Sequence, residues 1–216
     1  MFFDLADIPT GSYAKLLNTT TVPRPIAWVV SQTAEGALNA APFSYFNVMS
    51  TDPPIVAIGI GNRPGGGSKD SLANILETRQ FVVNFVSYEL RHLMNISGAD
   101  YDAGIDEIEK AGLTTTACEK IAVPRIAESP AAYECELFDT VDLGNGRKIT
   151  LGRVLAVHIA DDKVLDAEKL YIDTPKLDLV GRLHGRGWYC RLSDLFDMPR
   201  LTPEQADSRS GGDATD

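Results

Sequence analysis

The sequence of 216 residues predicts a mainly β protein with a few helices, arranged as an antiparallel barrel. Three observations lead to this fold class. Short apolar runs, bounded by proline, glycine or polar residues, are typical of buried strands. An Asn-Gly step separates two longer strand-like segments, which indicates a hairpin. Strands and long helices do not alternate, and this argues against a doubly wound α/β fold.

Three apolar runs are the expected central strands, because they are short and rich in β-branched or aromatic residues. They cover residues 26–30, 54–60 and 81–86. The segments 131–141 and 148–160 flank Gly144-Asn145-Gly146. Glycine and asparagine tolerate the positive φ angles of a tight turn, so these two segments are expected to form a long hairpin.

Helices are fewer and shorter than strands. The expected helices cover residues 70–78, 88–96 and, with a weaker pattern, 105–111. In the first of them Leu72, Ile75 and Leu76 fall on one stripe at the helical period, which predicts that this stripe faces the core.

The chain is expected to form one domain over residues 1–200, followed by an acidic tail over 201–216. A chain of this length buries enough surface to be stable without a metal or a disulfide. Residues 208–216 are polar and low in complexity, so the tail is expected to be disordered.

The formal net charge of -10 excludes function classes that depend on general attraction to phosphates, so no nucleic acid and no anionic membrane is expected as a partner. No membrane span and no signal peptide is visible, which favours a cytoplasmic protein. The three cysteines, Cys118, Cys135 and Cys190, form no Cys-x-x-Cys pair. They are interpreted as reduced thiols, and no metal site is expected.

Two phosphate-binding motifs nearly occur but are incomplete. Gly59-Ile-Gly61-Asn-Arg-Pro64 begins like a dinucleotide fingerprint, yet proline replaces the third glycine and the segment ends a strand without opening a helix. Gly66-Gly-Ser-Lys69 lacks the Gly-Lys-Ser/Thr junction of a Walker loop. Neither a Rossmann domain nor a P-loop is therefore expected.

The glycine-rich segment 63–71 runs directly into the first expected helix. The N-terminus of a helix binds anions well, and Lys69 and Arg63 supply positive charge there. One phosphate could bind at this point. The alternative is a glycine-rich turn with an ordinary N-cap from Ser68, Asp70 or Ser71 and solvated charges.

A second unusual segment covers residues 36–50, which combine small residues, hydroxyls, amides and aromatic side chains. Small residues let backbone approach a flat ligand, and Phe43, Tyr45 and Phe46 could form apolar walls, as an aromatic cofactor requires. Taken alone, the segment could also be a core strand.

A series of short motifs gives a resemblance to a known family. In chain order they are Val22-Pro-Arg-Pro-Ile-Ala27, Asn39-Ala-Ala-Pro-Phe-Ser44, Asp52-Pro-Pro54, Lys69-Asp-Ser71, Phe81-Val-Val-Asn84, Glu107 with Ala111-Gly112, Pro124-Arg125, Glu134-Cys135, Leu151-Gly-Arg-Val154 and Gly181-Arg-Leu183. In this order they resemble the flavin reductase-like family, the flavoredoxin type of FMN-binding split barrel. The resemblance covers roughly residues 10–200.

The resemblance implies a split β-barrel homodimer that binds one FMN per subunit near the subunit interface. It assigns a border of the isoalloxazine and ribityl chain to Asn39, Ala41, Pro42, Phe43 and Ser44. It assigns the phosphate end to Lys69, Asp70 and Ser71, where Ser71 replaces a more usual threonine and keeps the hydroxyl. Arg24 is expected to be either a further anion ligand or part of a surface ion pair.

The activity that the resemblance implies is hydride transfer from NADH or NADPH to FMN, so the expected partners are a small-molecule electron donor and acceptor. Two alternatives stay open. One is a flavoredoxin-like protein that retains its FMN and passes electrons on, and the other is a flavin-binding module without turnover. In each case the chemistry belongs to the flavin, and no side-chain acid is obligatory.

The segment 181–189 departs from the family pattern, because His184 stands where glycine is common and Arg186 and Trp188 follow. His184 is therefore a candidate for contact with the nicotinamide or substrate, against a purely structural role. Arginines here favour an anionic group on the donor or acceptor. The other two histidines, His92 and His158, are interpreted as structural.

Overall fold

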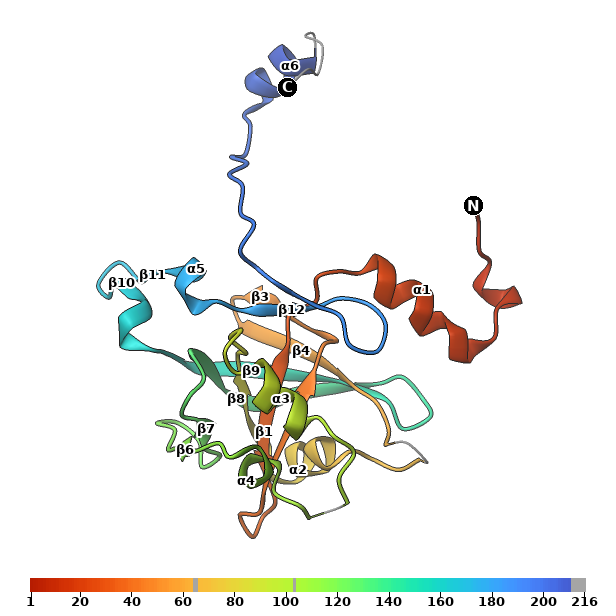
Figure 1. Cartoon of the computed structure of the whole chain (residues 1–216), viewed down its shortest axis with the longest axis vertical. Coiled ribbons are helices and arrows are strands. Elements are labelled where there is room, and N and C mark those ends of the chain that lie inside the picture. Colours follow the sequence, from red (N-terminus) through yellow and green to blue (C-terminus); the bar gives the residue numbers. More distant parts are fainter. Residues whose placement is uncertain (64–65, 103, 211–216) are drawn as a thin grey trace.

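The computed structural model describes residues 1–63, 66–102 and 104–210 (Figure 1). Its centre is a seven-stranded sheet in the order β2-β1-β5-β8-β9-β4-β3, in which each neighbouring pair is antiparallel. The strands are β1 (Ala27–Gln32), β2 (Leu38–Phe43), β3 (Phe46–Thr51), β4 (Pro54–Ile60), β5 (Gln80–Asn84), β8 (Ala131–Asp142) and β9 (Lys148–Ile159). The mainly β fold with few helices is therefore confirmed.

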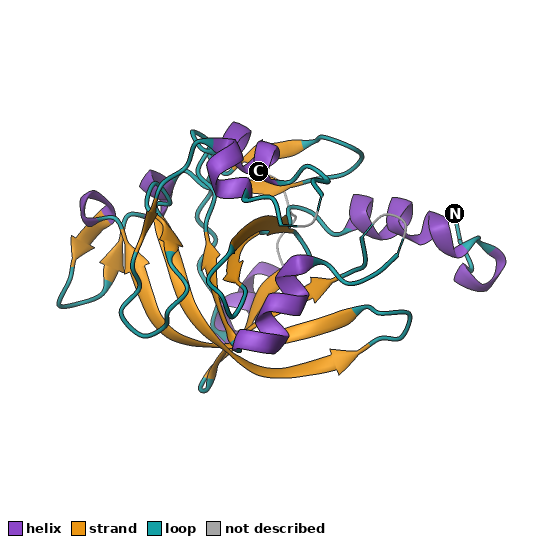
Figure 2. Ribbon diagram, turned by 90° about the horizontal axis from the view of Figure 1, so that it is seen from below, coloured by secondary structure: helices purple, strands orange, loops and turns teal. Residues whose placement is uncertain are grey.

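The sheet is strongly curved, as Figure 2 shows, but it is not a closed barrel. Strands β2 and β3 follow each other in the chain, yet they form the two opposite edges. Within the described residues no strand pairing joins these edges. The predicted antiparallel barrel is thus corrected to an open, curled sheet.

Alternation along β1 divides the core between the two faces of the sheet. Trp28 and Val30 belong to one buried cluster, whereas Ala27 and Val29 belong to the other. The first cluster packs against α3 (Arg91–Ser97) and α4 (Glu107–Ala111), and the second contains buried residues of α2 (Asp70–Thr78). Each large apolar side chain buried in this way stabilises the fold by roughly 1.5–3 kcal/mol.

The Phe81 side chain of β5 packs very closely against Gly152 of β9. A Cβ atom added to Gly152 would lie 2.3 Å from Cζ of Phe81, far inside van der Waals contact. The fully buried Phe81 ring therefore requires glycine at this position of β9.

The long hairpin is confirmed, since β8 and β9 pair over twelve residues each. Its turn uses positive φ angles at Gly144 (80°), Asn145 (52°) and Gly146 (74°), as an Asn-Gly turn permits. Register shifts interrupt the ladder between Glu134 and Cys135 and again near Leu137.

The predicted helix bounds agree best with the structure where the sequence marks both ends of the helix. Helix α2 covers the predicted residues, and it ends where Arg79 takes a left-handed conformation. Helix α3 begins at Arg91, later than predicted, because Ser87 pairs with Leu179 and the Tyr88 amide donates to the Asp178 carbonyl. Helix α4 begins after Asp106, whose side chain accepts hydrogen bonds from two amides of the first turn.

The remaining elements lie around the sheet. They are η1 (Leu5–Asp7), η2 (Thr10–Ser12), α1 (Tyr13–Thr20), β6 (Thr115–Thr116), β7 (Arg125–Ile126), η3 (Asp161–Lys163), β10 (Val164–Asp166), β11 (Tyr171–Ile172), α5 (Thr174–Leu177), β12 (Val180–Arg182), β13 (Tyr189–Arg191) and α6 (Pro203–Ser210). Both ends of the chain extend away from the sheet (Figure 1). The segment expected to be disordered thus contains the short helix α6, and its residues 211–216 lie outside the described residues.

Candidate functional site

A cavity of about 310 Å³ lies between β2, the start of α2 and the segment that follows α3. It brings together most of the residues predicted for the cofactor, which are Asn39, Ala41, Pro42, Lys69, Asp70 and Ser71. The segment 97–102 forms the opposite wall. Gly98 allows this approach, because a Cβ atom there would lie 3.0 Å from Cγ of Pro42.

The N-terminus of α2 opens into this cavity without a cap. Lys69 occupies the N-cap position and makes no side-chain capping hydrogen bond, so the predicted caps from Ser68, Asp70 or Ser71 are not formed. The amides of Leu72 and Ala73 donate to the Lys69 carbonyl, so within the described residues the amides of Asp70 and Ser71 are the ones left for a ligand. Together with the helix dipole they favour an anion at this point.

The side chains around this helix start are ordered by three contacts. Asn39 Nδ2 donates to Ser71 Oγ at 2.8 Å, and both side chains are buried. The Ser71 hydroxyl therefore keeps its own proton for a further acceptor. Lys69 Nζ lies 5.4 Å from the centre of the Phe43 ring, whereas Asp70 forms an ion pair with Arg63.

Glu107 also lines the cavity, although no role was predicted for it from the sequence. Its carboxylate is buried and accepts a hydrogen bond from the Ala40 amide at 3.0 Å. Burial raises the pKa of Glu107, and the negative charges of Asp70 and Asp106 act in the same direction. The signal that could have found it is the motif Glu107 with Ala111-Gly112, which was assigned only to the family pattern.

Carboxylates are thus part of this cavity as well as cations. They belong to Asp70, Asp100, Asp102 and Glu107, and the cations are Arg63 and Lys69. Asp70 is compensated by Arg63, and Glu107 holds the Ala40 amide. The cavity therefore offers both cations for an anionic group and hydrogen-bond acceptors for hydroxyl groups.

Three predicted cofactor residues do not line this cavity. Phe43 is buried in the second core cluster. Arg24 is 6% exposed, and its guanidinium donates to the carbonyls of Asn18, Thr21 and Leu183 at 2.7–2.8 Å. Its Nε also lies within 3.5 Å of Ser44 Oγ. Among the described residues Arg24 forms no ion pair, and its hydrogen bonds connect the Pro-Arg-Pro turn to the segment that leads to His184.

His184 lies outside the cavity, in the loop between β12 and β13. Its ring stacks on Trp188 with the ring centres 6.1 Å apart and an interplanar angle of 25°. Arg182 donates to the Gly185 carbonyl and lies 4.5 Å from the centre of the Tyr189 ring. The Arg24 contact to Leu183 brings this loop next to the end of β2.

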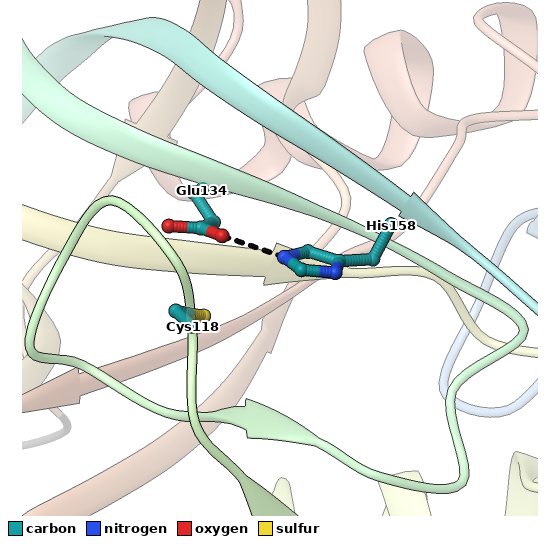
Figure 3. Close-up of side chains that lie close together, drawn as sticks. All are labelled: Cys118, Glu134 and His158. Atoms are coloured by element: carbon teal, nitrogen blue, oxygen red, sulfur yellow. Dashed lines mark hydrogen bonds and ion pairs between the residues drawn. The ribbon is translucent and has the colours of Figure 1, made fainter.

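A separate cluster joins Cys118, Glu134 and His158, whose donor atoms lie within 4.8 Å of one another (Figure 3). These atom types can bind zinc. However, the Glu134 oxygens already accept hydrogen bonds from His158 and from the amides of Glu119, Lys120 and Ile121. Burial, with Glu134 nearby, raises the pKa of the Cys118 thiol to about 11, so the thiol is neutral. The cluster is explained as an anchor that ties the 118–121 loop to β8 and β9.

The three cysteines are free thiols, of which Cys135 is buried and the other two are half-buried. Within the described residues no helix combines the length and the apolar character that crossing a membrane requires.

Comparison with known proteins identifies the family. The flavin reductase like domain matches residues 19–176. The structure is similar to the 2-nitrobenzoate 2-nitroreductase NbaA of Pseudomonas fluorescens, with 34% identity, a TM-score of 0.86 and coverage of 94% of this chain and 98% of that one. It is similar to nitrilotriacetate monooxygenase component B of Bacillus cereus, with 32% identity, a TM-score of 0.84 and coverage of 92% and 98%.

A third solved structure, a split barrel domain protein of Shewanella frigidimarina, shares the fold with 23% identity, a TM-score of 0.79 and coverage of 93% and 100%. The curled open sheet described above is thus the split barrel of these proteins. The domain match covers most of the chain, and the alignments with the first two relatives cover nearly the whole length of those proteins. The protein therefore belongs to the flavin reductase-like family.

Proposed function

We propose that this protein is an FMN-dependent oxidoreductase that passes a hydride from NADH or NADPH to FMN held in the cavity between β2 and α2. The observation that carries the proposal is the uncapped N-terminus of α2, flanked by Lys69 and by the Asn39–Ser71 pair, in a chain of this family. A phosphate group needs these donors.

The donor set fits FMN along its length. Lys69, the Ser71 hydroxyl and the first amides of α2 would hold the phosphate. Asp100 and Asp102 line the same cavity and suit the hydroxyls of a ribityl chain. Ala41 and Pro42 of β2 line the cavity and supply apolar surface, which suits a ring system. When bound, FMN supplies the redox chemistry, and this chain positions it and keeps water from one of its faces.

We infer that residues 1–200 form one domain and that two copies associate. Backbone bridges from Arg24 to Arg182 and from Ser87 to Leu179 support one domain. Exposed Phe196 (82%) supports a dimer, because a large apolar side chain favours a covered surface. The cavity volume lies at the low end for small-ligand sites, about 300–1,000 Å³, so a second copy would complete it. The free thiols fit a cytoplasmic protein.

The name of the first relative favours a second candidate function. A 34% identical 2-nitrobenzoate 2-nitroreductase suggests a protein that retains its flavin and reduces a small aromatic acceptor. The relative named as a monooxygenase component instead fits the diffusible-flavin reductase. A flavin-binding module without turnover is the third possibility.

The test begins with the absorbance spectrum of the purified protein and a titration with FMN. Flavin absorbance or saturable FMN binding supports the cofactor, and the absence of both would refute the proposal. Steady-state oxidation of NADH and NADPH then separates the candidates. A flavin reductase depends saturably on added FMN, a flavin-retaining enzyme turns over with an acceptor and needs no added FMN, and a binding module shows no turnover.

A further inference from the structure

A second cavity, of about 480 Å³, lies between the start of α3 and the hairpin of β12 and β13. It shares no lining residue with the cavity between β2 and α2. Tyr88, Arg91 and Asn95 line it from the helix side, and Arg186, Trp188 and Arg191 line it from the hairpin side.

Positive charge is concentrated in this second cavity. Three arginines line it and none of its lining residues is acidic, although the chain carries a net charge of -10. Asp178 neutralises Arg191 through two hydrogen bonds of 2.6 and 2.9 Å. Among the described residues neither Arg91 nor Arg186 forms an ion pair. Arg91 also donates to the Tyr88 carbonyl at 2.5 Å, but both guanidinium groups keep further N–H donors for an external anion.

Aromatic surface accompanies these charges. The Arg91 guanidinium lies 3.8 Å from the centre of the Tyr88 ring, and that of Arg191 lies 4.7 Å from it, so the ring helps to position both arginines. The Trp188 indole remains 63% exposed and is oriented by its stacking on His184. A large exposed indole beside a cavity offers a stacking surface to a flat ring.

We propose that this second cavity binds a planar aromatic ring that carries an anionic group, with the ring on Trp188 and the anion on Arg91 and Arg186. Guanidinium groups pair with carboxylates and phosphates through two parallel hydrogen bonds, and they also stack on aromatic faces. The ligand is therefore either an aromatic carboxylate or the phosphate-bearing adenosine part of a nucleotide. The inference does not depend on flavin binding elsewhere in the chain.

Isothermal titration calorimetry on the full chain, with and without saturating FMN, tests this inference. Benzoate and AMP are the anionic probes, and benzamide and adenosine are their uncharged counterparts. We expect saturable binding of at least one anionic probe, roughly tenfold or more tighter than its uncharged counterpart. Benzoate binding points to a carboxylate ligand, and AMP binding alone points to a nucleotide.

Variants locate the ligand. Arg91→Gln with Arg186→Gln should weaken binding of the anionic probe at least roughly tenfold, whereas Arg147→Gln, an exposed arginine in the β8–β9 turn, should leave it unchanged. Trp188 fluorescence gives a second readout, because the other tryptophan, Trp28, is buried in the core. The proposal is overturned if neither anion binds, if charge makes no difference, if the double variant binds normally, or if binding occurs only without FMN.

Discussion

His158 on β9 donates a hydrogen bond of 2.6 Å to Glu134 on β8 (Figure 3), and the same buried carboxylate accepts hydrogen bonds from three loop amides. A carboxylate with no exposed surface is stable only when its oxygens are paired in this way. One side chain thus joins the hairpin to the loop that follows β6.

This relationship predicts an acid-dependent loss of stability. Burial alone raises the pKa of Glu134, but the hydrogen bonds from the Glu119 and Lys120 amides and from His158 outweigh it, and the net pKa is lowered. The unfolded reference is about 4.3. The contribution is therefore present above that value and is lost as the pH falls through the lower pKa of the folded state.

The measurement is the free energy of unfolding of Glu134→Gln and of the native sequence between pH 7 and 3. We expect the variant to be about 2–4 kcal/mol less stable at pH 7, since it loses charge-assisted hydrogen bonds, and the difference to shrink toward pH 3. Glu77→Gln, an exposed position on α2, is the matched control. A constant difference over the whole pH range would contradict the assignment.

The phosphate end of FMN is predicted to depend on Lys69 and Ser71. Lys69→Ala with Ser71→Ala should weaken FMN binding by roughly 2–4 kcal/mol, because each removes a hydrogen bond to a charged group. FMN titration followed by fluorescence quenching measures this. Lys69→Ala alone guards against a folding defect at buried Ser71, and Lys169→Ala, beside Asp166 in an ion pair away from the cavity, serves as control. Unchanged affinity in the folded double variant would refute the site.

His184→Gly is predicted to change the rate of flavin reduction by NADH or NADPH while FMN affinity stays nearly the same. The reason is the position of the loop next to the end of β2, to which Arg24 connects it. Stopped-flow absorbance, normalised to bound flavin, measures the rate. If the variant loses stability but reduces its flavin at the native rate, the stacking of His184 on Trp188 is its whole role.

Gly152→Ala is predicted to destabilise the protein by about 1–3 kcal/mol, since an added methyl group would overlap Phe81 in a well-packed core. Thermal unfolding of the native chain and the variant gives the difference. Gly61→Ala is the matched control, because a Cβ atom there meets no heavy atom within 4 Å. Equal losses of stability in both variants would exclude the Phe81 contact as the cause.

The predicted homodimer should weaken when exposed apolar surface is removed. Phe196→Ser is expected to shift the protein toward monomer and to lower FMN affinity, since a second copy is proposed to complete the cavity. Sedimentation equilibrium at low micromolar concentration measures the first effect and FMN titration the second. Leu165 is also exposed, so Leu165→Ser tests whether loss of any exposed apolar side chain weakens the dimer. A native chain that is monomeric with one tightly bound FMN would argue against the dimer.

Local signals explain which parts of the fold were predictable. Strand β4 and helix α2 have the predicted bounds, because proline, glycine and a clear period mark both ends within the sequence. The hairpin of β8 and β9 follows from one turn. Segment 36–50 contains β2 and most of β3. These are edge strands, and most of β3 is exposed, so the alternation of apolar and polar residues that would predict a strand is weak there.

The candidate site was predictable where the residues are close in sequence. Lys69, Asp70 and Ser71 share one helix start, and Asn39 is brought to them by a single hydrogen bond. Glu107 was missed because its role depends on α4 packing beside β2, a contact between distant segments. Arg24 was predicted to be an anion ligand or part of a surface ion pair, because the sequence does not show that three backbone carbonyls accept hydrogen bonds from its guanidinium.

The edge of β2 explains why the barrel stays split. Along its outer side, Ala40 has its amide occupied by Glu107, and Pro42, two residues on, has no amide to donate. A strand needs such donors to recruit another strand. Neither β3 nor a strand of another chain can therefore form a regular backbone ladder with β2 along this stretch. The occupied Ala40 amide and the missing amide of Pro42 thus keep the outer edge of β2 unpaired, which leaves the cavity beside it accessible to a small molecule.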